Sequence, residues 1–211
     1  MCGHSYCSLP QRKISGEDDR TSEEHERFGR ALKGINAWYG HQKATVLLVT
    51  SDLPAGHEYI NTQPYEGRGW CVAEKRMSAI VKDQDALIDM RQLTGNEATV
   101  KDLIKNGKSK REPPMAPDLF HAMLKNGVTD QSIKFTKAGD VDVVADIYRR
   151  AFLDEMSAAS SLEYGSLGWG AEQMTTLFNA LGYAGLETLP PLKYAAHTNE
   201  HAVVLSCVSS R

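Results

Sequence analysis

The sequence of 211 residues predicts an α/β fold, in which a partial parallel sheet with crossover helices is followed by a mainly helical extension. Three observations indicate this class. Helical and strand-like patterns alternate between residues 21 and 90, two short apolar runs there resemble buried strands, and the clearest apolar periods after residue 117 are helical. Alternation of helix and strand at these lengths is typical of parallel sheets.

The first helix is expected to begin at Thr21, after an irregular segment at residues 1–20. Thr21 and Glu24 have the spacing of a capping box, in which each side chain binds the other residue's backbone N–H. An apolar stripe follows at helical spacing, and Gly40 is the expected stop. The stripe consists of Phe28, Leu32, Ile35 and Tyr39.

The two predicted strands are Ala44–Thr50 and Ala86–Met90. The first is a nearly continuous apolar run rich in β-branched residues, which predicts a strand buried on both faces. A loop at residues 51–67 and a helix over Trp70–Ile80 connect the two strands. Residues 21–92 are therefore expected to form the α/β domain.

Residues 93–117 are predicted to be a linker, and the basic run Lys108–Arg111 within it is expected to be a solvated loop. Residues 118–190 are predicted to be the helical extension, and residues 191–211 an uncertain tail. The extension should contain a short helix over Leu119–Leu124, a helix capped by Asp140, and a helix over Ala171–Leu181 that stops at Gly182. Their expected core residues are Val144, Ile147, Ala151, Met156, Met174, Leu177, Phe178 and Leu181.

Composition narrows the possible partners and the location. The formal charge of −3 gives no general attraction to phosphate backbones, so no nucleic-acid partner is expected. The most apolar run, Ala44–Val49, is too short to span a membrane. No secretory signal is visible, and four cysteines without a CxxC pair favour reduced thiols in the cytoplasm. Cys2, His4 and Cys7 make an incomplete ligand set, so no metal site is predicted.

The candidate site combines Arg68, Trp70 and Glu74 at the start of the second helix. Glu74 lies one turn beyond Trp70, just after a glycine-containing loop. Helix N–H groups, an aromatic ring and a carboxylate together suit a nucleotide or a sugar. Alternatively, Trp70 is a core anchor, Glu74 is an acid favoured by the helix dipole, and Arg68 is a surface cation that pairs with Glu66 or Glu74.

The run Trp70-Cys71-Val72-Ala73-Glu74 resembles the WCxxE segment of Toll/interleukin-receptor (TIR) domains, which have a flavodoxin-like sheet. In the members that cleave NAD, the glutamate of this segment is the catalytic acid. The resemblance therefore implies Glu74 as the catalytic residue, NAD as a substrate, and Trp70 and Cys71 as packing residues at the helix start. Arg68 and Trp70 are the candidate binding residues of the site described above. The stretch Ser8–Gln11 is similar to the SLPQ motif of fungal heterokaryon-incompatibility domains. A group of proteins from unicellular eukaryotes has a similar series of motifs in the same order. The matching segments here are Ser8–Gln11, Arg20–Phe28, the buried strand Val46–Thr50 and Tyr65–Glu74.

A second resemblance lies near the C-terminus. Leu167–Ala171, followed by leucines at 177, 181, 186 and 189, is similar to one leucine-rich repeat of the ribonuclease-inhibitor type. An amphipathic helix with a leucine-bearing turn is the alternative. A single unit is visible, whereas a solenoid needs about three.

Three functions follow as hypotheses. The first is a TIR-like signalling domain that associates with its own copies or with another protein. The second is an NAD-cleaving glycohydrolase that uses Glu74. The third is a fragment of a larger leucine-rich-repeat protein without a function of its own, because the opening strand of a TIR domain is not evident.

Overall fold

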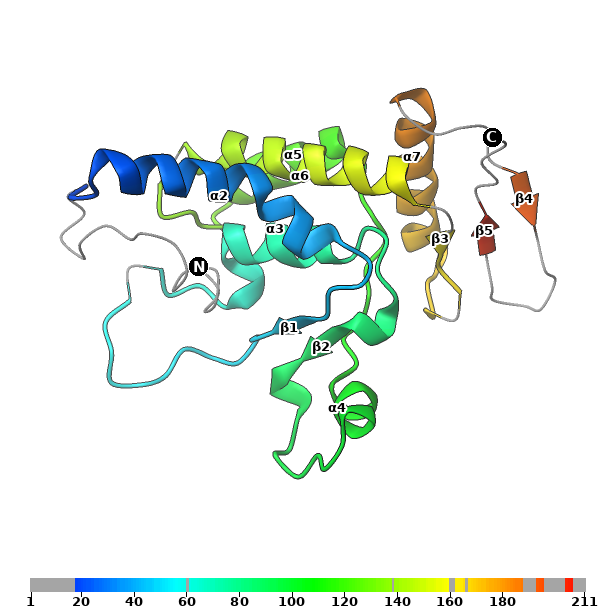
Figure 1. Cartoon of the computed structure of the whole chain (residues 1–211), viewed down its shortest axis with the longest axis horizontal. Helices are drawn as coiled ribbons and strands as arrows, with labels where there is room; N and C mark the ends of the chain where they lie inside the picture. The colour runs from blue at the N-terminus through cyan, green and yellow to red at the C-terminus, as the bar shows by residue number, and fades with distance from the viewer. Residues whose placement is uncertain are drawn as a thin grey trace.

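The computed structural model describes residues 18–59, 61–137, 139–159, 162–165, 167–187, 193–195 and 204–206. The SLPQ stretch, the Cys2-His4-Cys7 group and most of the tail lie outside these residues. The described helices are α2 (Ser22–Gly40), α3 (Gly69–Ser78), α4 (Val100–Gly107), α5 (Pro117–Thr129), α6 (Asp140–Ala158) and α7 (Ala171–Glu187) (Figure 1). The strands are β1 (Val46–Leu48), β2 (Leu87–Asp89), β3 (Leu162–Glu163), β4 (Lys193–Ala195) and β5 (Val204–Ser206). Short 3-10 turns are η1 (Tyr65–Gly67), η2 (Gln84–Ala86) and η3 (Met90–Gln92).

Helix α2 begins with the predicted capping box. The backbone N–H of Glu24 donates to Oγ1 of Thr21 at 3.3 Å, and Oε2 of Glu24 accepts the backbone N–H of Thr21 at 2.7 Å. The helix ends at Gly40, as expected. A Cβ atom there would lie 2.7 Å from Cγ of Glu155, so the end of α2 packs closely against α6.

Strands β1 and β2 form the predicted parallel pair, and α3 is part of the connection between them. Val46 lies beside Leu87, and Leu48 lies beside Asp89. The chain is therefore a mixed α/β protein. A second, antiparallel sheet has the order β3-β5-β4.

The expectation that the first strand is buried on both faces is wrong. Leu48 is buried against Tyr65 of η1 and Cys71 of α3, whereas the side chain of Leu47 is 57% exposed and that of Val49 is 54% exposed. On this outer face α4 covers the neighbouring strand, because Ile88 packs against Gly107. The cover does not extend over β1.

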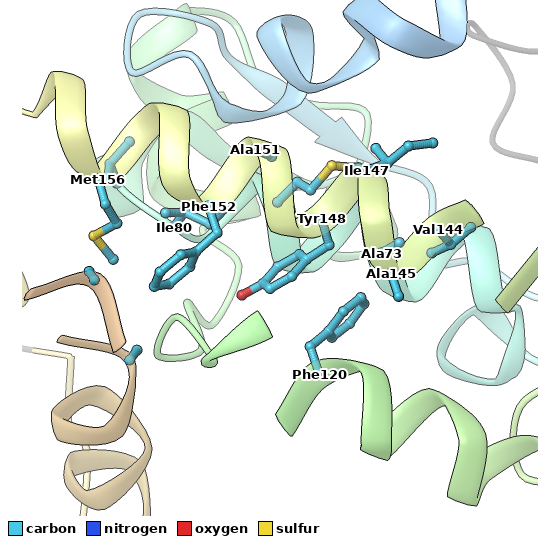
Figure 2. Packing of buried hydrophobic residues seen from close by; sticks show 14 of the residues in the cluster. Ala73, Ile80, Phe120, Val144, Ala145, Ile147, Tyr148, Ala151, Phe152 and Met156 are labelled. Carbon is cyan, nitrogen blue, oxygen red and sulfur yellow. The ribbon is translucent and has the colours of Figure 1, made fainter. Parts of the chain in front are cut away.

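The main core joins α2, α3, α5, α6 and α7 (Figure 2). The centroid of the Phe120 ring lies 4.1 Å from that of Tyr148, and Tyr148 in turn lies next to Phe152 on α6. Helices from both predicted parts of the chain thus share one core. The core positions predicted on α6 are confirmed as buried: Val144, Ile147, Ala151 and Met156.

Several helix ends differ from the sequence expectations. Gly139, and not Asp140, is the N-cap of α6, and Asp140 is its first residue. Helix α5 starts earlier and ends later than Leu119–Leu124, since Pro117 suits a first helical position. Helix α7 continues through Gly182 to Glu187.

Phe178 is not a core residue, because its side chain is 53% exposed. The buried stripe of α7 runs instead through Leu177, Ala180, Leu181 and Ala184. Phe178 follows Leu177 by one residue and therefore points about 100° away around the helix.

The basic run at residues 108–111 is a solvated loop only in part, because Lys108 and Lys110 are exposed whereas Arg111 is buried. Arg111 is 4% exposed, and its guanidinium donates to the carbonyls of Ala79 at 3.1 Å, Ile80 at 3.2 Å and Glu163 at 2.7 Å. Its Cζ also lies 4.5 Å from the centroid of the Tyr164 ring. Arg111 therefore satisfies carbonyls just beyond the C-terminal end of α3 and ties them to β3.

In the part of the chain that the structure describes, no helix has the length and apolar content that are needed to cross a membrane.

Candidate functional site

The start of α3 is closed by the loop that connects α5 to α6. The backbone N–H of Gly69 donates to the carbonyl of Lys134 at 3.1 Å, and the N–H of Lys134 donates to the carbonyl of Gly67 at 2.8 Å. The ring of Phe135 lies directly over Gly69, where a Cβ atom would meet ring carbon Cζ at 2.2 Å. The sequence suggested that backbone N–H groups at the start of this helix could bind an anion. One of them, the N–H of Gly69, instead donates to a carbonyl of the protein.

Trp70 connects α3 to α6. Its indole Nε1 donates to Oδ2 of Asp140 at 3.0 Å, and its ring packs against the main core. The acceptor stands in the first turn of α6, where the helix dipole stabilises a carboxylate. These contacts correspond to the core-anchor alternative for Trp70.

Glu74 is almost fully buried, with 2% of its surface exposed. It lies in the second turn of α3, and Ser78 Oγ donates to its backbone carbonyl at 2.8 Å. Cys71 and Ser78, its neighbours on the same side of the helix, are also buried. A substrate therefore has no direct access to the Glu74 carboxylate in this conformation.

Arg68 occupies the N-cap position of α3 and is half-buried. Its Cζ lies 5.7 Å from the centroid of the Tyr65 ring. Its Nε atom is buried and has no hydrogen-bond acceptor among the described residues. The structure thus brings Arg68, Trp70 and Glu74 onto one helix, but Trp70 faces α6 and Glu74 is enclosed.

The carboxyl ends of β1 and β2 hold a small polar group. Thr50 Oγ1 donates to Oδ1 of Asp89 at 2.5 Å, and the same oxygen accepts the backbone N–H of Arg91 at 3.1 Å. Ligand sites of parallel sheets usually lie at this edge. Here the Asp89 carboxylate is occupied by local hydrogen bonds. Within the described ranges no three His, Cys, Asp or Glu side chains are grouped closely enough to hold a metal ion.

Lys82 is a buried amine that sequence reasoning missed. It is fully buried, and its Nζ donates to the backbone carbonyl of His41 at the end of α2. Burial lowers the pKa of Lys82 to about 8, although the nearby Glu155 carboxylate opposes the shift. Its position directly after the apolar run Ala79–Val81 was the available signal. Because the Lys82 amine is enclosed by the fold, its role is in packing.

The outer face of β1 consists of Leu47, within the strand, and Val49, which follows its last residue Leu48; both are exposed apolar residues. The two side chains point the same way because residues two apart share a face of a strand. Met90 of η3, which contacts β1, is also exposed. Two aliphatic side chains are thus presented side by side to solvent.

The chain matches no protein-family model, no curated protein and no solved structure.

Proposed function

We propose that this protein acts through contacts with other protein chains, as a TIR-like association domain, and that the outer face of β1 is its contact surface. The observation that carries the proposal is the exposure of Leu47, at 57%, on a strand of a parallel sheet, and of Val49, at 54%, directly after that strand. Parallel sheets are normally covered on both faces. Because the outer face of β1 is uncovered, its exposure favours binding of a partner over it.

The burial of Glu74 supports association over NAD cleavage. Electrostatic stabilisation of a reacting ribose requires the carboxylate to lie close to the developing charge. With 2% of its surface exposed, Glu74 has no such contact with a bound molecule. The motif that resembles the TIR segment then serves to pack α3 against its neighbours.

Burial of the outer face contributes favourably to the free energy of association. Complete removal of a leucine or valine side chain from water stabilises a complex by about 1.5–3 kcal/mol. Leu47 and Val49 are partly covered already, so each adds roughly half of that value at a contact surface.

Sedimentation velocity over a range of protein concentrations tests the proposal. We expect the wild type to associate, and Leu47→Lys to weaken the association at least about tenfold because a charge replaces an apolar contact. Phe178→Lys is the matched control, since Phe178 is similarly exposed but lies on α7, away from β1 (Figure 1). A wild type that stays monomeric throughout, or equal losses in the two variants, would exclude this face.

A further inference from the structure

The two edges of the parallel sheet differ in their backbone pairing. Beyond β2, Ile88 forms a bridge with Lys108, and the N–H of Ser109 donates to the carbonyl of Leu87 at 3.0 Å. On the side of β1 that faces away from β2, the described residues contain no further strand. No backbone hydrogen bond from a described residue reaches residues 45–50 on that side. Among the described residues, the open edge of the sheet is therefore that of β1, next to the exposed side chains of Leu47 and Val49.

An open strand edge offers unpaired backbone groups to another strand. In an antiparallel pair, directly opposite residues point to the same face. If two copies of β1 run antiparallel about a twofold axis at Leu48, then Leu47 of each copy lies opposite Val49 of the other. The outer face is thus self-complementary, because each exposed aliphatic side chain meets another.

The charges beside β1 favour the antiparallel direction. Lys43 precedes the strand and is exposed, whereas Asp52 follows it with a side chain that is 85% exposed. Nη2 of Arg91 lies 3.8 Å from Oδ2 of Asp52, and Asp89 adds a second carboxylate, so these three side chains leave this end with one net negative charge. Antiparallel pairing sets the basic end of one copy beside the acidic end of the other, whereas parallel pairing sets like charges together.

We infer that the partner is a second copy of this chain, joined edge to edge through antiparallel β1 strands, so that a four-stranded sheet of order β2-β1-β1-β2 runs across the dimer. The inference rests on the proposed function, and it adds the identity, direction and register of the partner. A contact of this kind is isologous, since the same strand of both copies forms it.

Directed disulfide formation tests the register. Leu47→Cys and Val49→Cys are made separately, in a background where Cys2, Cys7 and Cys207 are replaced by serine. Cys71 is retained because it is fully buried. The two variants are mixed, oxidised and separated by intact mass.

We expect the mixed disulfide between a Leu47→Cys copy and a Val49→Cys copy to exceed either homodimeric disulfide at least about fivefold, because only the mixed pair stands directly opposite at disulfide distance. A statistical mixture, or no disulfide in a background that still associates in sedimentation, would overturn the antiparallel edge while leaving the proposed association intact. Absence of association in sedimentation velocity would contradict both the antiparallel edge and the proposed association.

Discussion

The indole nitrogen of Trp70 and the carboxylate of Asp140 are joined by a 3.0 Å hydrogen bond across 70 residues of sequence. The bond fixes the start of α3 against the start of α6 and so positions the crossover helix of the parallel pair. It also engages Trp70, which the sequence suggested as a ligand-binding residue.

Replacement of Trp70 by phenylalanine should remove this bond while it keeps most of the ring packing. We expect a loss of about 1–2 kcal/mol in the free energy of unfolding, as is typical for a bond to a charged acceptor. A double-mutant cycle with Asp140→Ala, measured by urea denaturation, should show a coupling of at least about 0.5 kcal/mol. Zero coupling would mean that the bond does not contribute to stability.

Glu74 should contribute to stability and not to NAD cleavage. Because its side chain is buried and engaged within the fold, Glu74→Ala should destabilise the protein by roughly 1–3 kcal/mol. In an NAD-consumption assay, wild type and Glu74→Gln should both remain at the background rate. Turnover by the wild type that a folded Glu74→Gln variant lacks would instead identify a catalytic carboxylate.

Arg111 should be intolerant even of lysine. Its fork of donors reaches three carbonyls from two segments, and a single ammonium does not reproduce that geometry. We expect Arg111→Lys to lower the free energy of unfolding by about 2–3 kcal/mol. Lys110→Arg, at the exposed neighbouring position, is the control and should change stability by less than about 0.5 kcal/mol. Similar effects in both variants would refute the role of Arg111.

Lys82 should make stability depend on pH in the alkaline range. Its pKa is about 8 in the folded protein against an ordinary 10.5, so the folded state binds fewer protons than the unfolded state between these values. Unfolding then takes up a proton, and stability contributed by this group rises with pH in that window and is lowest below pH 8.

The comparison with Lys82→Met isolates this contribution. The carbonyl of His41 keeps a partner in the variant, since the N–H of Ala44 also donates to it at 3.1 Å. We expect the variant to be at least as stable as the wild type at pH 7, and the wild type to gain up to roughly 3 kcal/mol relative to it by pH 10. Chemical denaturation at several pH values measures the difference, and a constant difference would contradict the assignment.

The elements that the sequence predicted best are those with local signals. The capping box at Thr21 and Glu24 and the parallel β1–β2 pair are confirmed. Their determinants lie within a few residues, in side-chain hydrogen bonds and in short apolar runs.

The features that were missed depend on contacts distant in sequence. Nothing near Leu47 indicates that α4 covers only the neighbouring strand. The apolar run therefore predicts burial on both faces, although one face is exposed. Similarly, the burial of Arg111 depends on carbonyls at residues 79, 80 and 163, which no local pattern reveals. The sequence predicted the helix that carries Trp70 and Glu74, but the enclosure of Glu74 results from tertiary packing.

Amide hydrogen exchange at residues 45–50, compared between low and high protein concentration, tests the association surface most directly. We predict that exchange of these amides slows at least about tenfold at high concentration, because strand pairing buries the open edge of β1, while amides around Phe178 on α7 exchange at an unchanged rate. Protection that develops on α7 or elsewhere, with residues 45–50 unaffected, would contradict the account.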